Sequence, residues 1–92
     1  GLGEALKRAD SLGITAMQVH ASAPQAWNRQ PFKCGCEDVF LELREKSNVG
    51  AVFFHGIYLI NLATPDPEKQ HLAKLSLIHS LDLMHRIRGD GV

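Results

Sequence analysis

The sequence predicts an α/β fold in which helices alternate with parallel strands. Helical periodicity and strand-like apolar runs follow one another in the order helix, strand, helix, strand, helix. The segment 49–62 is almost continuously apolar, which is typical of a parallel strand covered on both faces. Proline and glycine clusters separate these segments, as expected where secondary-structure elements end.

The first three elements follow from periodicity and from the chemistry of their ends. Residues 2–12 place apolar side chains on one face of a helix, and Gly13 suits its C-terminus. Residues 14–22 are rich in β-branched and apolar side chains and predict a strand. A loop of about a dozen residues follows, and loops of that length are often functional. The next helix, from Glu37, begins with acids and ends with bases, in agreement with the helix dipole.

The second half of the chain predicts a strand and a long helix. The strand lies within residues 49–62, and Pro65 and Pro67 stop it. Asp66 has the side chain expected of an N-cap for a helix over residues 68–88. The apolar positions of that helix are spread so widely that we expect it to be covered on more than one side.

Two parallel strands leave the predicted fold incomplete. Each strand would be an edge with unpaired backbone N–H and C=O groups, whereas parallel sheets ordinarily have more strands and covered faces. We therefore expect residues 1–92 to form a single segment of a larger α/β architecture. Pairing of strands between copies of the chain is the expected way to complete the sheet.

Composition narrows the functional classes. Apolar residues make up 45% of the chain and the formal net charge is +0 with neutral histidines, so a core is feasible and long-range attraction to nucleic acid is not expected. We expect neither a signal peptide nor a membrane helix, because charges begin at Glu4 and polar residues interrupt the uncharged stretch 47–65. Cys34 and Cys36 form no disulfide framework, which favours a cytoplasmic protein, and they are a weak zinc signal.

Candidate functional residues lie where the two strands end, the edge at which parallel α/β folds bind ligands. They are His20, Ser22, Gln25 and Trp27 after the first strand, and His55, Tyr58 and Asn61 after the second. Imidazole is a common ligand of zinc, and an aromatic side chain in a strand-end loop can wedge into a base stack. On spacing alone, ordinary packing is the more frequent role for His55 and Tyr58, and Asn61 can simply bind loop backbone groups. Three further histidines fall on the long helix, where we expect them to be solvated or partly buried: His71, His79 and His85.

Residues 55–69 read His-Gly-Ile-Tyr-Leu-Ile-Asn-Leu-Ala-Thr-Pro-Asp-Pro-Glu-Lys and resemble the signature of the endonuclease IV family of apurinic/apyrimidinic endonucleases. Residues 1–20 are similar to that family's first helix and second strand, and residues 22–27 fall where its DNA-recognition loop lies. The resemblance covers essentially the whole chain. It implies a fragment of a TIM-like (β/α)8 barrel of the xylose-isomerase type, from the first helix through the third.

The resemblance also implies a function: zinc-dependent DNA repair by cleavage of the phosphodiester backbone 5′ to abasic sites. His55 matches a zinc ligand, and Tyr58 and Leu59 match residues that enter the DNA stack beside the flipped-out nucleotide. Gln25 and Trp27 match positions of the DNA-recognition loop. Catalytic zinc needs three protein ligands, and a barrel of this class takes about 250 residues. We therefore expect the 92 residues to be inactive on their own.

The chain departs from the family pattern in the recognition loop. The family usually reads Asn-Pro-Arg-x-Trp, and here Ala23 and Gln25 stand at the Asn and Arg positions. Losing the arginine removes a cation suited to the DNA backbone or minor groove. Ile57 stands where proline is common, which is a milder change.

Two alternative functions stay open. One is a non-catalytic α/β module that self-associates through its open strands. The other is a fragment of a sugar isomerase or epimerase, since such enzymes share the barrel. A small sugar does not need a wedge such as Tyr58 and Leu59, which speaks against the second alternative.

Overall fold

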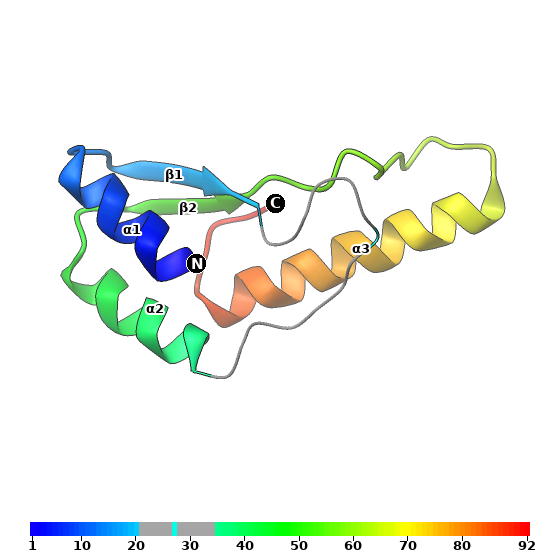
Figure 1. The fold of residues 1–92 in the computed structure, drawn as a ribbon. Coiled ribbons are helices and arrows are strands. Elements are labelled where there is room, and N and C mark those ends of the chain that lie inside the picture. The colour runs from blue at the N-terminus through cyan, green and yellow to red at the C-terminus, as the bar shows by residue number, and fades with distance from the viewer. Residues whose placement is uncertain (21–26, 28–34) are drawn as a thin grey trace.

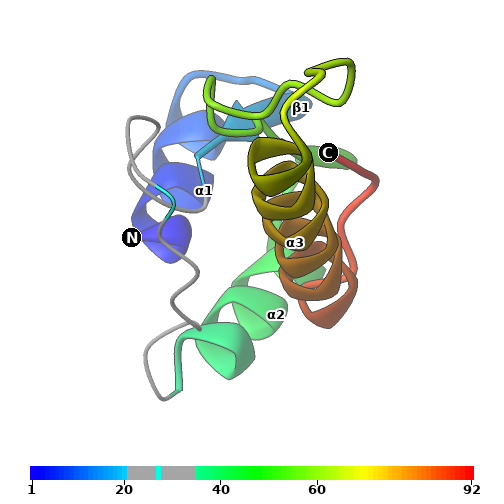
Figure 2. The ribbon, with the colours of Figure 1, turned by 90° about the vertical axis from the view of Figure 1, so that its right-hand side faces the viewer.

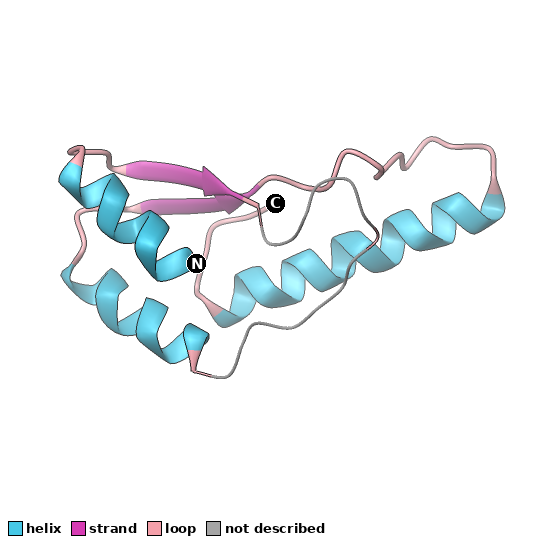
Figure 3. Cartoon of the chain, viewed as in Figure 1, coloured by secondary structure: helices cyan, strands magenta, loops and turns pink. Residues whose placement is uncertain are grey.

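The computed structural model of the chain describes residues 1–20, 27 and 35–92. The elements are α1 (Leu2–Ser11), β1 (Ala16–Val19), α2 (Cys36–Lys46), β2 (Ala51–Phe54) and α3 (Pro67–Arg86) (Figures 1 and 3). This is the predicted α/β order, and the two strands pair in parallel as expected. β2 ends at Phe54 although the apolar pattern continues, because the chain leaves the strand there and turns at residues 58–59. β1 begins at Ala16, two residues later than its pattern indicates, and ends at Val19.

The sheet has one covered face and one bare face. Met17 pairs with Val52 and Val19 pairs with Phe54, and these side chains pack into the core. The alternate positions point the other way, and Phe53 among them is 39% exposed. Figures 1 and 2 show α1, α2 and α3 on the same side of the strands. Within the described residues, the expectation that the second strand is covered on both faces is therefore wrong.

The C-terminal end of the chain adds to the sheet beside β2. Gly91 forms an isolated parallel bridge with Phe53, and the Phe54 N–H donates to the Gly91 carbonyl at 3.0 Å. Successive N–H groups of a strand point to opposite edges, and the His55 N–H already bonds β1. Gly91 therefore lies on the edge of β2 away from β1. This sequential neighbour order is that of a (β/α) barrel.

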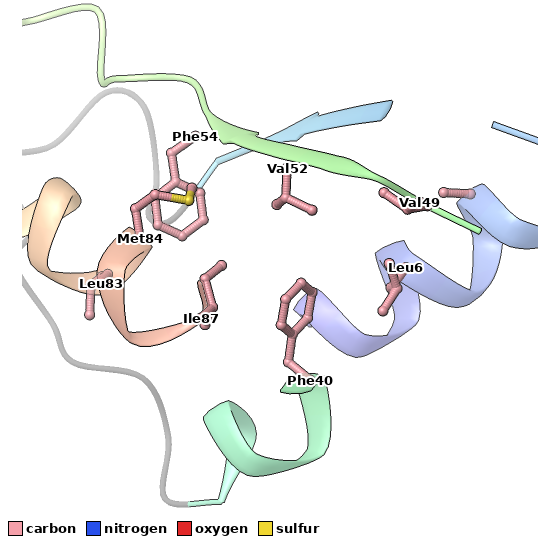
Figure 4. Close-up of a cluster of buried hydrophobic side chains, with 9 residues drawn as sticks. Leu6, Phe40, Val49, Val52, Phe54, Leu83, Met84 and Ile87 are labelled. Atoms are coloured by element: carbon pink, nitrogen blue, oxygen red, sulfur yellow. The ribbon is translucent and has the colours of Figure 1, made fainter. Parts of the chain in front are cut away.

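The core lies between the sheet and the three helices. Its largest buried side chains are each at most 1% exposed: Leu6, Phe40, Val52, Phe54 and Ile87. Figure 4 shows Phe40 rising from α2 between Leu6 and Ile87, with Val52 pointing down from the strand. Burial of these apolar surfaces is the main force that holds the helices against the strands.

Local sequence signals define the helix ends as predicted. Gly13 follows α1 with a φ of 71°, and its N–H and that of Ile14 bond back to α1 carbonyls. Asp66 is the N-cap of α3, where its side chain accepts from the N–H of Glu68 at 2.9 Å and of Lys69 at 3.4 Å. These contacts fix where the loops toward the strands begin.

Among residues 1–20, 27 and 35–92, helix α3 is covered along one side, contrary to the expectation from its wide apolar set. Its buried residues are Ala73, Ser76, Leu83 and Met84. Ile78 and Leu81 are 63% and 47% exposed. Neither α3 nor any other described helix is long and apolar enough to cross a membrane.

Arg44 connects α2 to the C-terminal segment. Its guanidinium donates to the Arg88 carbonyl at 2.9 Å and to the Gly50 carbonyl at 3.3 Å. The same group lies 3.5 Å from the Asp90 carboxylate, which also accepts the Val52 N–H at 2.8 Å. This network holds the C-terminal segment against β2.

Candidate functional site

Two histidines stand directly after the two strands. Val19 and Phe54 are the last strand residues and are partners in the parallel register, so His20 and His55 leave the sheet at the same edge. The His55 N–H donates to the Val19 carbonyl at 2.8 Å, which fixes the two strand ends relative to each other. The two imidazole centroids lie 4.9 Å apart, with the rings inclined edge-to-face at 62°. The sequence offered each histidine as a separate candidate, and the structure brings them together.

The histidine pair belongs to the bare face of the sheet. Side chains alternate along a strand, so His20 continues the row that contains Gln18, and His55 continues the row that contains Phe53. Both histidines are exposed. In a complete (β/α) barrel the face opposite the helices lines the interior, and its carboxyl-terminal edge is where ligands bind.

A backbone carbonyl beside His55 determines which nitrogen of its neutral ring carries the proton. Its Nδ1 lies 2.7 Å from the Gly56 carbonyl oxygen. A carbonyl can only accept a hydrogen bond, so Nδ1 carries the proton and the neutral ring has its lone pair on Nε2. Metal-binding histidines commonly donate their second ring N–H to a backbone carbonyl in this way. The environment of His55 thus fits a zinc ligand.

The described residues do not by themselves make up a catalytic zinc site. Catalytic zinc takes three protein ligands, and residues 1–20, 27 and 35–92 contain no cluster of three or more histidine, cysteine, aspartate or glutamate side chains able to hold a metal. Cys36 is the exposed first residue of α2, and Cys34 lies outside the described residues. On α3, as expected, His71 and His85 are exposed and His79 is half-buried.

In the loop from β2 to α3, the two residues of the predicted wedge differ in solvent exposure. Tyr58 is 67% exposed, whereas Leu59 is half-buried. The preceding Ile57 is only 7% exposed, and its carbonyl accepts the Ile60 N–H at 3.1 Å. A buried anchor and a tight turn therefore hold the Tyr58 ring out from the protein.

The remaining sequence candidates divide into three groups. The Asn61 side chain accepts the Ala63 N–H at 3.1 Å, so the simpler prediction that it binds loop backbone is confirmed. Trp27 is half-buried. Ser22 and Gln25 lie outside the described residues.

Comparisons with known proteins point to one family, although no family model matches the chain. A protein named probable endonuclease 4 from Halorhodospira halophila is 33% identical over 87 residues, which are 95% of this chain and 29% of that protein. Endonuclease 4 from Thermus thermophilus is 34% identical over 62 residues, 67% of this chain and 23% of its own length. A crystal structure of endonuclease IV, also from Thermus thermophilus, matches with a TM-score of 0.90 at 28% identity, over 97% of this chain and 33% of that one.

These matches agree with the predicted fold class. The three helices and two parallel strands superpose on part of the endonuclease IV barrel, and the chain spans between 23% and 33% of the length of the three proteins. In sequence and in fold, this chain corresponds to one segment of the endonuclease IV family.

Proposed function

We propose that this segment recognises abasic sites within a zinc-dependent DNA-repair endonuclease. The observation that carries the proposal is Tyr58, an aromatic side chain that is 67% exposed in a loop anchored by Ile57. This loop leaves the edge where His55 is placed, in a chain similar to proteins named endonuclease 4. A single exposed apolar side chain is ordinary on a protein surface, so the support for a binding role is the place of Tyr58 in this loop and its match to the wedge position of the family.

Tyr58 would act as the wedge. Apolar and aromatic side chains inserted between bases unstack them, and this costs least where a base is already missing. Stacking of a ring on a neighbouring base is worth about 1–3 kcal/mol. Leu59 would support the ring from its half-buried position, and Trp27 and Gln25 would add DNA contacts from the recognition loop.

His55 would hold the metal through Nε2 while the Gly56 carbonyl fixes its Nδ1 proton. Bound zinc would supply Lewis-acid activation of the phosphodiester and neutralise the charge that develops during its hydrolysis. Because catalytic zinc takes three protein ligands, we expect binding of abasic DNA by the 92 residues, without strand cleavage.

The test compares two duplexes by fluorescence anisotropy, one with a single tetrahydrofuran abasic analogue and one fully paired. We expect Tyr58→Ala to weaken binding of the abasic duplex by about 5- to 150-fold, the equivalent of one lost stacking contact, with the paired duplex unaffected. Ile78→Ala is the matched control, because Ile78 is 63% exposed but lies on α3. Equal affinity of wild type and Tyr58→Ala for the abasic duplex would refute the proposal.

The open sheet supports a second proposal, that copies of the chain associate. β1 pairs with β2 alone in the described part of the chain, and an unpaired strand edge is a template for another strand. The bare face beside it exposes Phe53. Light scattering over a concentration series should show dimers or larger species, and a monomer at every concentration would contradict association.

A further inference from the structure

We infer that His20 and His55 together bind a single divalent transition-metal ion, with His20 as a ligand in its own right. The resemblance to endonuclease IV assigns a metal role to His55 alone. The inference concerns metal binding by this pair and does not depend on DNA recognition by Tyr58.

The separation of the rings suits a shared ion. Two imidazoles on one zinc ion, with Zn–N bonds of about 2.1 Å and a near-tetrahedral angle, have centroids about 5 Å apart. The observed separation is 4.9 Å. Aromatic pairs that bind no metal also have centroids about 4.5–7 Å apart. The contacts and solvent exposure of the two rings therefore have to distinguish a metal site from simple packing.

The backbone holds both ligands before any metal arrives. The parallel register of Val19 with Phe54 and the 2.8 Å bond from the His55 N–H fix the two strand ends side by side. The 2.7 Å contact of His55 Nδ1 with the Gly56 carbonyl directs the lone pair to Nε2. A site whose ligands are already positioned loses little conformational freedom on binding.

Solvent access and ligand spacing favour this pair over the other histidines. Both rings are exposed, so an ion can enter and complete its coordination with water. The α3 histidines are spaced eight and six residues apart, which places successive ones about 12 Å and 9 Å apart along the helix and too far apart to share one ion. Within the described residues, His20 and His55 are thus the histidines with a geometry for joint binding.

Calorimetric titration with Zn²⁺ alone tests the inference, in a chain carrying Cys34→Ser and Cys36→Ser so that thiols do not compete. We expect one ion per chain, and a loss of affinity of about tenfold or more in His20→Ala and in His55→Ala, since each leaves an ordinary single imidazole. His71→Ala is the matched control, because His71 is an exposed histidine on α3, and it should bind like the parent chain.

A second variant separates ligation from ring stacking. His20→Phe keeps an aromatic ring beside His55 but removes both nitrogens, so it should bind zinc as weakly as His20→Ala while retaining the circular dichroism spectrum of the parent. In the parent chain, zinc should shift ring ¹⁵N resonances of both His20 and His55. Parent-like binding by either His20 variant, absence of binding by the parent, or one ion per two chains would overturn the inference. Because no DNA is present, such a failure leaves the Tyr58 proposal to its own test.

Discussion

Replacing Arg44 with methionine should destabilise the chain strongly, although Arg44 lies in no candidate binding site. The Arg44 side chain is only 17% exposed. Its guanidinium joins α2 to the Arg88 and Gly50 carbonyls and to the Asp90 carboxylate, so a single residue closes the C-terminal segment onto β2. Methionine keeps most of the apolar stem and removes all of these polar contacts.

The magnitude follows from the individual contacts. Hydrogen bonds that involve a charged group contribute about 1.5–3 kcal/mol each, and the 2.9 Å bond to the Arg88 carbonyl is the best formed of the set. The bond to Gly50 is longer, at 3.3 Å, and the Asp90 carboxylate is 43% exposed, so solvent screening weakens that ion pair. We expect a loss of about 2–3 kcal/mol, which in a domain of this size lowers Tm by about 10–20 °C.

Urea unfolding followed by far-ultraviolet circular dichroism measures this loss. Arg86→Met is the matched control, because Arg86 is exposed and pairs with Asp82 at 3.1 Å and Glu37 at 3.5 Å. The hydrogen bond and charge of Asp82, with the charge of Glu37, raise the pKa of Arg86, but solvent screens such surface pairs. Arg86→Met should therefore have a much smaller effect than Arg44→Met. Equal destabilisation by the two substitutions would refute the importance of the Arg44 network.

Two further predictions concern the helices. Asp66→Ala removes the side chain that caps α3 and should cost about 1 kcal/mol in urea unfolding, whereas Asp66→Asn, which keeps an acceptor, should cost much less. Equal costs for the two substitutions would contradict the capping role. Phe40→Ala empties the centre of the core, where the ring is fully buried, and should cost about 3–5 kcal/mol in thermal melts. Its neighbour Val39 is 53% exposed, so a Val39→Ala loss as large as that of Phe40→Ala would contradict the placement of the core.

The element order and the helix ends could be predicted from sequence because they depend on neighbouring residues. Asp66 caps α3 by accepting from the N–H groups of the residues two and three positions later, and Gly13 ends α1 by taking a positive φ. Both signals act within one turn of helix. No information about distant parts of the chain was needed.

The strand lengths could not be predicted in the same way. The apolar pattern continues after Phe54, but Ile57 is buried within a loop rather than in a strand. A short apolar run indicates that its residues are buried, but it does not indicate whether the backbone there is a strand or a loop. The bare face of β2 could not be predicted for the same reason. The residues on both of its faces are apolar, and the sequence does not show which face the helices cover.

The histidine pair and the Arg44 network depend on contacts between distant residues. His20 and His55 meet because β1 and β2 are in register, and Arg44 meets Asp90 across 46 residues. A usable signal for the histidines did exist, because each follows its strand by one residue. The sequence places both histidines at strand ends, but only the register of β1 with β2 shows that the two rings lie side by side.

Both the proposed metal site and the proposed functional edge depend on the position of His20 beside His55. Nuclear Overhauser effects between the ring protons of the two histidines would test it most directly. With centroids 4.9 Å apart, we expect clear cross-peaks between the rings, accompanied by a contact from the His55 amide proton to Val19. A well-dispersed spectrum in which His20 contacts other strand residues and shows no cross-peak to His55 would contradict the register and the site built on it.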